Sequence, residues 1–306
     1  MSHPFRQPKA QRLLERVALF FRAAEIYLRT SRHIVFVCGG PVTKKKFARK
    51  KFLDYAKSNL SNFTFFLAED ASYDLLAHGK PQFLNLSEFE RLIGEIADCI
   101  ILFPETPGSI AELGLFSAHE DTREKLLLAN SIIHRADESF INRGPVATTD
   151  IDSIFRPTLF YTNLSSKDVT FSDIGKLLKN RLCNSLQRKH FDHDTLRTMK
   201  LRDRLLLVYE MIKLFHPIDH EGLNRVITST FSRPETEELR VLLSILIAAK
   251  YIKRHGHGPY FFAPSQQAPN FFDYETQDYS GLRIDIIDFY RSHYRDAYTL
   301  MQEKTR

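Results

Sequence analysis

The sequence of 306 residues contains no tryptophan and only three cysteines. Cys38, Cys99 and Cys183 form no CxxC pair. Cys38 and Cys99 lie within apolar runs, where cysteine acts as a small buried hydrophobe. The odd number and the spacing argue against a disulfide framework or a zinc site and predict a reducing, cytoplasmic environment.

The sequence also lacks an apolar run long enough to span a membrane. Its first strongly apolar segment, residues 11–28, is interrupted by Arg16, Arg22 and Glu25. We therefore expect no signal peptide and no membrane association. The segment is typical of an amphipathic helix that docks on the protein or on another subunit.

Excess positive charge is concentrated in one part of the chain. Residues 1–150 contain 20 Lys/Arg against 18 Asp/Glu, whereas residues 167–265 contain 17 against 11. The basic part favours a nucleic acid or another polyanion as partner. Many basic surfaces bind nothing, so charge alone does not decide this.

The first half alternates strand and helix patterns. Apolar strand-like runs alternate with helical periodicity, the strands expected at 33–40, 62–70, 98–105 and 125–130 and the helices at 42–60, 85–97 and 109–120. Unbroken apolar strands in this order predict an α/β domain with a Rossmann-like or flavodoxin-like parallel sheet covered on both faces. In such folds the binding site lies beyond the C-terminal ends of the strands.

The second half follows a different pattern. Three predicted helices at 201–215, 218–231 and 233–252 precede a basic Gly/Pro turn and an aromatic strand, which predicts a mostly helical winged-helix domain. The pattern of the C-terminal segment predicts one more amphipathic helix. The expected divisions are an N-terminal helix (1–32), a catalytic domain (33–165), a helical connector (166–200), a winged-helix domain (201–265) and a C-terminal helix (266–306).

The segment "FPETPGSIAELGLF" (103–116) allows two interpretations of Glu112. Ser109 followed three residues later by Glu112 fits a capping box, so Glu112 can simply begin a helix. The same Gly108-Ser109 turn, at the end of a predicted parallel strand, also offers backbone N–H groups to an anion. Gly39 and Gly40 follow the first strand, where glycine lets the backbone approach a phosphate.

Carboxylates are predicted to gather at the same edge. They are Glu69, Asp70, Asp74, Glu105 and Glu112. A carboxylate cluster beside an anion site suits a substrate with a sugar and a phosphate. The glycines do not match GxGxxG, which disfavours a dinucleotide-dependent dehydrogenase.

Four motifs, "FVCGG", "AEDASYDLLAHG", "IILFPETPGSIAELGLFS" and "SFINRGPV", occur in this order in residues 36–146. In them the chain resembles the retron-associated nucleoside deoxyribosyltransferase-like effectors, toxins of phage-defence systems that also contain a reverse transcriptase and its RNA–DNA product, msDNA. The second half resembles these effectors only in its winged-helix architecture.

The resemblance implies cleavage of N-glycosidic bonds. It places the catalytic glutamate, which attacks the anomeric carbon, at Glu112. Asp70, and less directly Glu69 and Asp74, would hold the base or sugar, and Glu105 would orient Glu112 or raise its pKa by like-charge repulsion. The glycines Gly39, Gly40 and Gly108, with Ser109, would hold phosphate or ribose oxygens.

The resemblance leaves the substrate open between NAD⁺ and deoxyadenine nucleotides. NAD⁺ is favoured because its nicotinamide already carries a positive charge and leaves without a general acid, whereas adenine needs a proton from a second acid such as Asp70. No cofactor is expected beyond NAD⁺ as substrate. The predicted partners are reverse transcriptase and msDNA, which would inhibit the toxin in a homo-oligomer or multi-subunit complex.

Two other function classes remain. A non-enzymatic regulator that senses a nucleotide and binds nucleic acid would bind nucleotide without releasing a base. A housekeeping deoxyribosyltransferase would turn over freely and would give the winged helix no role.

Basic segments outside this site also allow two interpretations each. The run "KKKFARKK" (44–51) can contact phosphates or form a solvated helix face. In "KRHGHGPY" (253–260), Lys253, Arg254 and Tyr260 can contact nucleic acid in a wing, or the wing can dock a protein. His255 and His257 have no Cys or acid at ligand spacing, so no metal is expected.

Overall fold

A computed structural model describes most of the chain. The described residues are 3–23, 26–29, 33–69, 86–164, 166, 169–183, 189–190, 198–231, 236–256, 260–266, 268–274 and 278–303. They form two compact units. The first unit contains residues 3–29 and 189–303, and the second unit contains residues 33–69 and 86–183. The N-terminal helix therefore belongs to the same unit as the C-terminal half, and the finer domain boundaries stay predictions.

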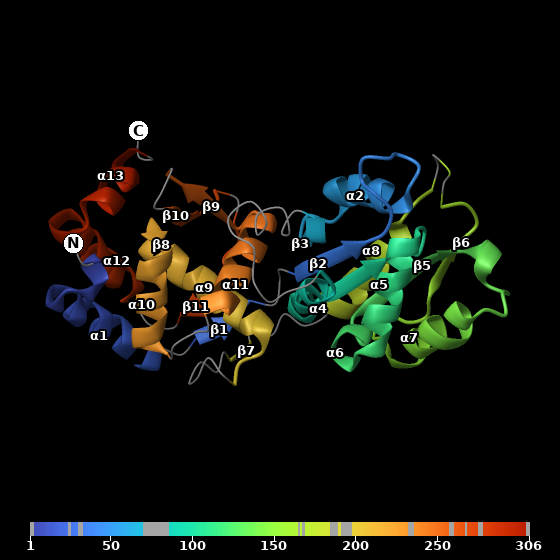
Figure 1. The fold of residues 1–306 in the computed structure, drawn as a ribbon, viewed down its shortest axis with the longest axis horizontal. Coiled ribbons are helices and arrows are strands. Elements are labelled where there is room, and N and C mark those ends of the chain that lie inside the picture. Colours follow the sequence, from blue (N-terminus) through green and yellow to red (C-terminus); the bar gives the residue numbers. More distant parts are fainter. Residues whose placement is uncertain are drawn as a thin grey trace. The chain divides into compact units, whose positions relative to one another are not determined.

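The second unit is built on a five-stranded parallel sheet (Figure 1). Its strands are β2 (His33–Cys38), β3 (Phe63–Phe66), β4 (Cys99–Leu102), β5 (Leu126–Ser131) and β6 (Leu159–Tyr161). The spatial order β3-β2-β4-β5-β6 is that of flavodoxin-like sheets. This confirms the predicted α/β class and parallel sheet, and it adds β6, which the sequence pattern did not indicate.

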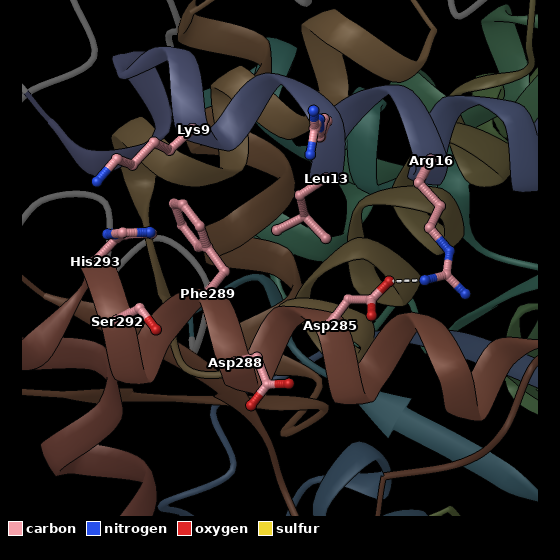
Figure 2. A pocket seen from close by; sticks show the side chains of 9 residues that line it. Lys9, Leu13, Arg16, Asp285, Asp288, Phe289, Ser292 and His293 are labelled. Carbon is pink, nitrogen blue, oxygen red and sulfur yellow. Dashed lines mark hydrogen bonds and ion pairs between the residues drawn. The ribbon is translucent and has the colours of Figure 1, made fainter.

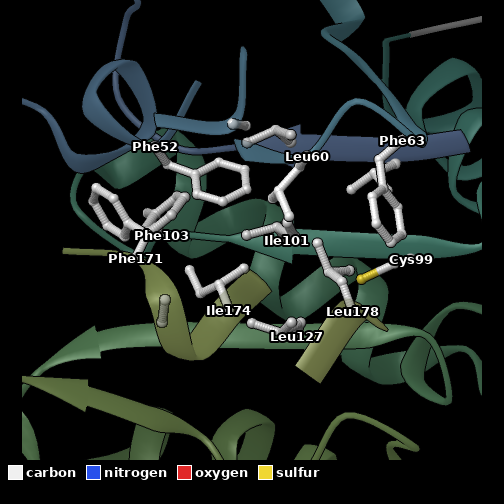
Figure 3. Close-up of a cluster of buried hydrophobic side chains, with 14 of the residues drawn as sticks. Phe52, Leu60, Phe63, Cys99, Ile101, Phe103, Leu127, Phe171, Ile174 and Leu178 are labelled. Carbon is white, nitrogen blue, oxygen red and sulfur yellow. The ribbon is translucent and has the colours of Figure 1, made fainter. Parts of the chain in front are cut away.

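Helices cover both faces of this sheet. They are α2 (Ala48–Asn59), α4 (Leu86–Ile96), α5 (Pro107–Ala118), α6 (Glu120–Arg123), α7 (Ala147–Asp152) and α8 (Ser172–Leu182), with single helical turns at Ile132–His134 and Asn142–Val146. Figure 3 shows one face, where side chains of α2 and α8 pack against Ile101 and Leu127. On the other face α4 and α5 lie over Ile100 and Phe36. Strands buried on both faces explain the unbroken apolar runs.

Strand order fixes where the site lies. β3 pairs with one edge of β2 and β4 pairs with the other, so the connections through α2 and α4 leave on opposite faces of the sheet. A crevice opens at such a reversal, beyond the carboxyl ends of the strands. Here it lies beyond the ends of β2 and β4.

The first unit is mostly helical, with two three-stranded antiparallel sheets, β11-β1-β7 and β8-β10-β9. Its helices are η1 (Pro4–Arg6), α1 (Pro8–Ala23), α9 (Leu201–Phe215), α10 (His220–Thr230), α11 (Thr236–Ala248), α12 (Tyr279–His293) and α13 (Arg295–Glu303). Its strands are β1 (Ile26–Leu28), β7 (Lys189–His190), β8 (Ile218–Asp219), β9 (Ile252–His255), β10 (Phe261–Pro264) and β11 (Phe272–Tyr274).

Two expectations for this unit change. The predicted single C-terminal helix is two helices, because Tyr294 leaves helical geometry and packs its buried ring against His3, Phe5 and Phe261. The predicted N-terminal helix ends at Ala23 and is followed by β1, while α1 packs on α10 and α12. None of the helices in the described part of the chain combines the length and apolar character needed to cross a membrane.

Candidate active site

The N-terminus of α2 is held at the crevice by the carboxylate of Glu105, which follows β4. Its Oε2 accepts a hydrogen bond from the backbone N–H of Ala48 (2.8 Å), and its Oε1 accepts from Gly40 (3.0 Å) and Arg49 (3.2 Å). These bonds satisfy N–H groups that the first turn of a helix leaves unpaired. They also explain why α2 begins at Ala48 and not at residue 42 as predicted.

The glycines after β2 allow this close approach. A Cβ on Gly40 would lie 2.3 Å from the ring of Phe47, and one on Gly39 would lie 3.0 Å from the Cβ of Arg49 and 3.2 Å from Glu105 Oε1. Gly39 and Gly40 are therefore packed against Arg49, Phe47 and Glu105. Their place in the structure follows from this packing, and their predicted contact with substrate oxygens stays a prediction.

The start of α5 differs from the predicted capping box. The N-cap is Thr106, whose Oγ1 accepts from Ser109 N (3.2 Å), while Ser109 Oγ accepts from Thr106 N (2.9 Å). The reciprocal pair is thus Thr106 with Ser109, and the prediction that Glu112 closes the box is wrong. Ser109 is buried inside this cap, whereas Gly108 is exposed at the tip of the helix.

Glu112 therefore has no structural task at the helix start. Its side chain is half-buried, and its Oε2 is buried without a hydrogen-bond partner among the described residues. Burial raises the pKa of Glu112, the guanidinium of Arg49 opposes the rise, and the charge of Glu69 adds to it. A hydrogen bond from the Cys38 thiol also opposes the rise. Glu69, and not Glu105, is thus the carboxylate that raises this pKa.

A second buried carboxyl group, which the sequence analysis missed, belongs to Glu90 on α4. Only 9% of Glu90 is exposed. Burial, followed by the charges of Glu112 and Glu69, raises its pKa to about 7, and Arg49 opposes the rise. The signal was present in the sequence, because Glu90 lies on the apolar stripe of its helix with Ile93 and Gly94, where a charged side chain is unexpected.

Arg49 was also missed, since it lies in a basic run whose other members looked like a solvated face. It is the second residue of α2 and is only 4% exposed. Its Nε donates to Gly40 O (2.7 Å), and its Nη atoms pair with Glu69, which follows β3. Arg49 thereby neutralises part of the negative charge at the crevice.

The predicted site residues are thus brought together only in part. The structure gathers Glu69, Glu105 and Glu112 at one edge, joined by Glu90 and Arg49. Asp70 and Asp74 lie outside the described residues. Carboxyl groups with raised pKa values in a crevice are candidates for acid–base and nucleophilic catalysis.

The predicted nucleic-acid residues lie on the β9–β10 hairpin of the first unit. Lys253 is exposed, and the guanidinium of Arg254 lies over the rings of Tyr260 (5.0 Å) and Phe262 (6.0 Å). His257 lies outside the described residues. Among the residues that are described, no group of three His, Cys, Asp or Glu side chains is arranged to hold a metal ion.

A groove between α1 and α12 in the same unit is lined by side chains of both charges (Figure 2). Its volume is about 540 Å³, and its charged lining mixes Lys9, Arg12 and Arg16 with Asp285 and Asp288. Arg16 is paired with Asp285. This mixture is less suited to a polyanion than the exposed Lys253 of the hairpin.

Comparison with known proteins identifies relatives of the chain. Residues 45–254 match the family model described as "STM3845 retron effector protein". Over 149 residues the chain is 36% identical to the "Retron Ec86 putative ribosyltransferase/DNA-binding protein" of Escherichia coli, a match covering 48% of this chain and 46% of that protein. It is 26% identical over 238 residues to the corresponding Retron Ec73 protein of Escherichia coli, covering 72% and 74%. The first match thus spans less than half of that relative's length.

Proposed function

The chain belongs to the STM3845 retron effector family, and from this premise we propose that it is an N-glycosidase that cleaves nucleotides at the anomeric carbon, with NAD⁺ as the favoured substrate. The relatives' names include ribosyltransferase, which supports glycosyl-transfer chemistry. The observation that carries the proposal is the pair of carboxyl groups with raised pKa values, Glu90 buried and Glu112 half-buried, at the crevice of the parallel sheet.

Glu112 is the proposed nucleophile. Its carboxylate oxygen forms a bond to C1′ as the bond from C1′ to the base nitrogen breaks, and the electron pair of that bond leaves with the base. Water then hydrolyses the sugar ester and restores the carboxylate. The buried Oε2, which has no hydrogen-bond partner among the described residues, suits this role because no bond to the described protein must be broken first.

Glu90 is the proposed acid for substrates whose base leaves as an anion. With a pKa of about 7 it is protonated in a large fraction of molecules at neutral pH. Adenine can therefore receive a proton as it departs, a task that the sequence analysis gave to Asp70. Nicotinamide leaves NAD⁺ as a neutral molecule and needs no proton, so Glu112 alone suffices there.

The finer fold assignments belong to the same proposal. The flavodoxin-like strand order supports a nucleoside deoxyribosyltransferase-like catalytic unit. The order α9, β8, α10, α11, β9, β10, with β8 and β9 both pairing β10, supports a winged helix. We propose that this part binds msDNA or reverse transcriptase and that their binding restrains a toxic activity. The words "DNA-binding" in the relatives' names support the first partner.

The test is a mass-spectrometric nucleotide profile of cells expressing the wild type, Glu112→Gln or Glu120→Gln without other retron components. Glu120 is an exposed glutamate on α6 and serves as a matched control. Loss of NAD⁺ with release of nicotinamide in the wild type and Glu120→Gln, but not in Glu112→Gln, supports the proposal. Loss of deoxyadenine nucleotides with free adenine keeps the mechanism and changes the substrate. Identical profiles in all strains reject the enzyme and favour a nucleotide-sensing regulator.

A further inference from the structure

A second cavity lies beyond the ends of β4, β5 and β6, and its lining includes Glu105 but neither Glu112 nor Glu90. Its volume is about 550 Å³, and its lining includes Ile110, Asn130, Ile133, His134, Thr162 and Leu164. Ile110 and Glu112 are two residues apart on α5, which places them about 200° apart around the helix. The cavity and the Glu112 carboxylate therefore lie on different sides of α5, at the same edge of the sheet.

Asn130, the penultimate residue of β5, lines this cavity. Only 5% of the residue is exposed. Its Oδ1 accepts a hydrogen bond from Ser131 N (2.8 Å), and its Nδ2 has no hydrogen-bond partner among the described residues. Because Asn130 lines the cavity, its N–H₂ group is available there to a ligand with a hydrogen-bond acceptor.

The walls of the cavity favour a flat ring. Ile110 and Ile133 are among the exposed large apolar side chains of the chain, and Ile133 is 70% exposed. Such side chains gain by covering an apolar surface. An uncharged aromatic ring between them, with an acceptor facing Asn130, satisfies both features.

His134 adds the complementary group. Its Nδ1 lies 3.0 Å from Asp137 Oδ2, and the neutral tautomer that donates this hydrogen bond leaves Nε2 as an acceptor. A donor on Asn130 and an acceptor on His134 match the edge of adenine, which places an amino group beside a ring nitrogen. Guanine presents a carbonyl where adenine has the amino group.

We propose that this cavity binds the adenine ring of a dinucleotide substrate, whose scissile N-glycosidic bond lies on the Glu112 side of α5. The phosphates would cross the N-terminus of α5 at Gly108, where the backbone is exposed and a Cβ would meet only Thr106 Oγ1, at 3.9 Å. The inference deepens the proposed N-glycosidase function and rests on it for the position of the scissile bond; the adenine site itself stands on the cavity.

The first test is binding of AMP to the full chain by calorimetry, which requires no catalysis. Asn130→Asp keeps the acceptor for Ser131 N and removes the donor, and Asn130→Leu removes both. Both variants are expected to weaken AMP binding at least tenfold, with melting temperatures as a check of folding. Asn59→Leu, an exposed asparagine at the end of α2, is the matched control and should bind AMP like the wild type.

GMP is the ligand control and should bind at least tenfold more weakly than AMP. The absence of tryptophan provides a second readout, since Ile133→Trp places the only tryptophan at the cavity, where AMP should quench its fluorescence. The inference is overturned if AMP fails to bind at millimolar concentration, if Asn130→Asp binds it as the wild type does, or if GMP binds equally well.

The second test separates this inference from the proposed function. NAD⁺ carries an adenylate half, and nicotinamide mononucleotide does not. Asn130→Asp should raise KM for NAD⁺ at least tenfold while leaving KM for the mononucleotide and both kcat values near those of the wild type. Equal KM effects on both substrates contradict the inference. Absence of base release from both substrates refutes NAD⁺ cleavage alone, and AMP binding then still decides the adenine site.

Discussion

Glu90 on α4 and Glu112 on α5 share one buried site, and the negative charge of Glu112 helps to raise the pKa of Glu90 to about 7. The two carboxyl groups come from helices on the same face of the sheet, joined through β4. Burial raises the pKa of both groups, and Arg49 opposes both rises. The proposed mechanism uses Glu112 as the anion and Glu90 as the acid.

The pH dependence of base release should differ between substrates. For a deoxyadenine nucleotide, kcat/KM should fall about tenfold per pH unit above pH 7, because Glu90 loses the proton that adenine needs. For NAD⁺ there should be no fall in this range. Glu90→Gln should remove most of the activity toward the deoxyadenine nucleotide and little of that toward NAD⁺. Equal losses on both substrates would exclude Glu90 as an acid.

Glu90 should also make the protein less stable as pH rises. Its pKa is higher in the folded protein than the ordinary value of 4.5, so folding favours its protonated form. Its contribution to stability is complete below pH 4.5 and is lost as pH rises through 7. A rise of this size corresponds to about 3 kcal/mol. Glu90→Gln should therefore increase the free energy of unfolding at pH 8 by up to about 3 kcal/mol and change it little at pH 4.5, as measured by urea denaturation.

Replacement of Arg49 should move the acidic limb of the activity profile. Its guanidinium lowers the pKa values of Glu90 and Glu112. In Arg49→Met, Glu112 should therefore become protonated at a higher pH, and the acidic limb should move to higher pH. Loss of the bonds to Gly40 and Glu69 should cost about 1–3 kcal/mol of stability. Arg49→Lys should restore the pH profile in part. Lys50→Met, the neighbouring residue on α2, should leave the profile unchanged, and an equal shift there would remove the role of Arg49.

The cap of α5 should be separable from catalysis. Thr106→Val removes the hydroxyl that accepts from Ser109 N and should lower the free energy of unfolding by about 1 kcal/mol. Glu112→Gln should leave it unchanged or slightly higher, because Glu112 takes no part in the cap and its charge is partly buried. A loss near 1 kcal/mol in Glu112→Gln would restore the capping interpretation.

The hairpin should contribute to DNA binding through charge. Lys253→Ala should weaken binding of a short DNA duplex and reduce the slope of log K against log salt by about 0.9, the value for one phosphate contact. Lys57→Ala, an exposed lysine on α2, is the control and should leave the slope unchanged. An unchanged slope in Lys253→Ala would favour protein docking as the role of the hairpin.

The sequence predicted the parallel sheet because its strands are buried on both faces and read as continuous apolar runs. It missed β6, whose three residues Leu159–Tyr161 are too short for a periodic signal and depend on pairing with β5. It correctly placed Glu112 at the carboxyl edge of the sheet. It was wrong about the capping box, which Thr106 forms with Ser109 and not Ser109 with Glu112.

The remaining site residues depend on tertiary contacts. Arg49 resembles its neighbours in the basic run 44–51 and becomes distinct only through its burial against Gly40 and Glu69. Glu105 looked like a partner of Glu112 because both follow β4, yet its carboxylate binds the backbone of α2. Only Glu90 could have been found from sequence, as a charge on an apolar helix face.

The most direct measurement compares base release by purified wild type and Glu112→Gln, with NAD⁺ and dATP as substrates and chromatography of the free base as readout. The account predicts that Glu112→Gln loses at least a thousandfold in kcat with an unchanged melting temperature, because the nucleophile is removed and the cap of α5 remains. Base release at a rate near that of the wild type would contradict the central claim that Glu112 carries the chemistry.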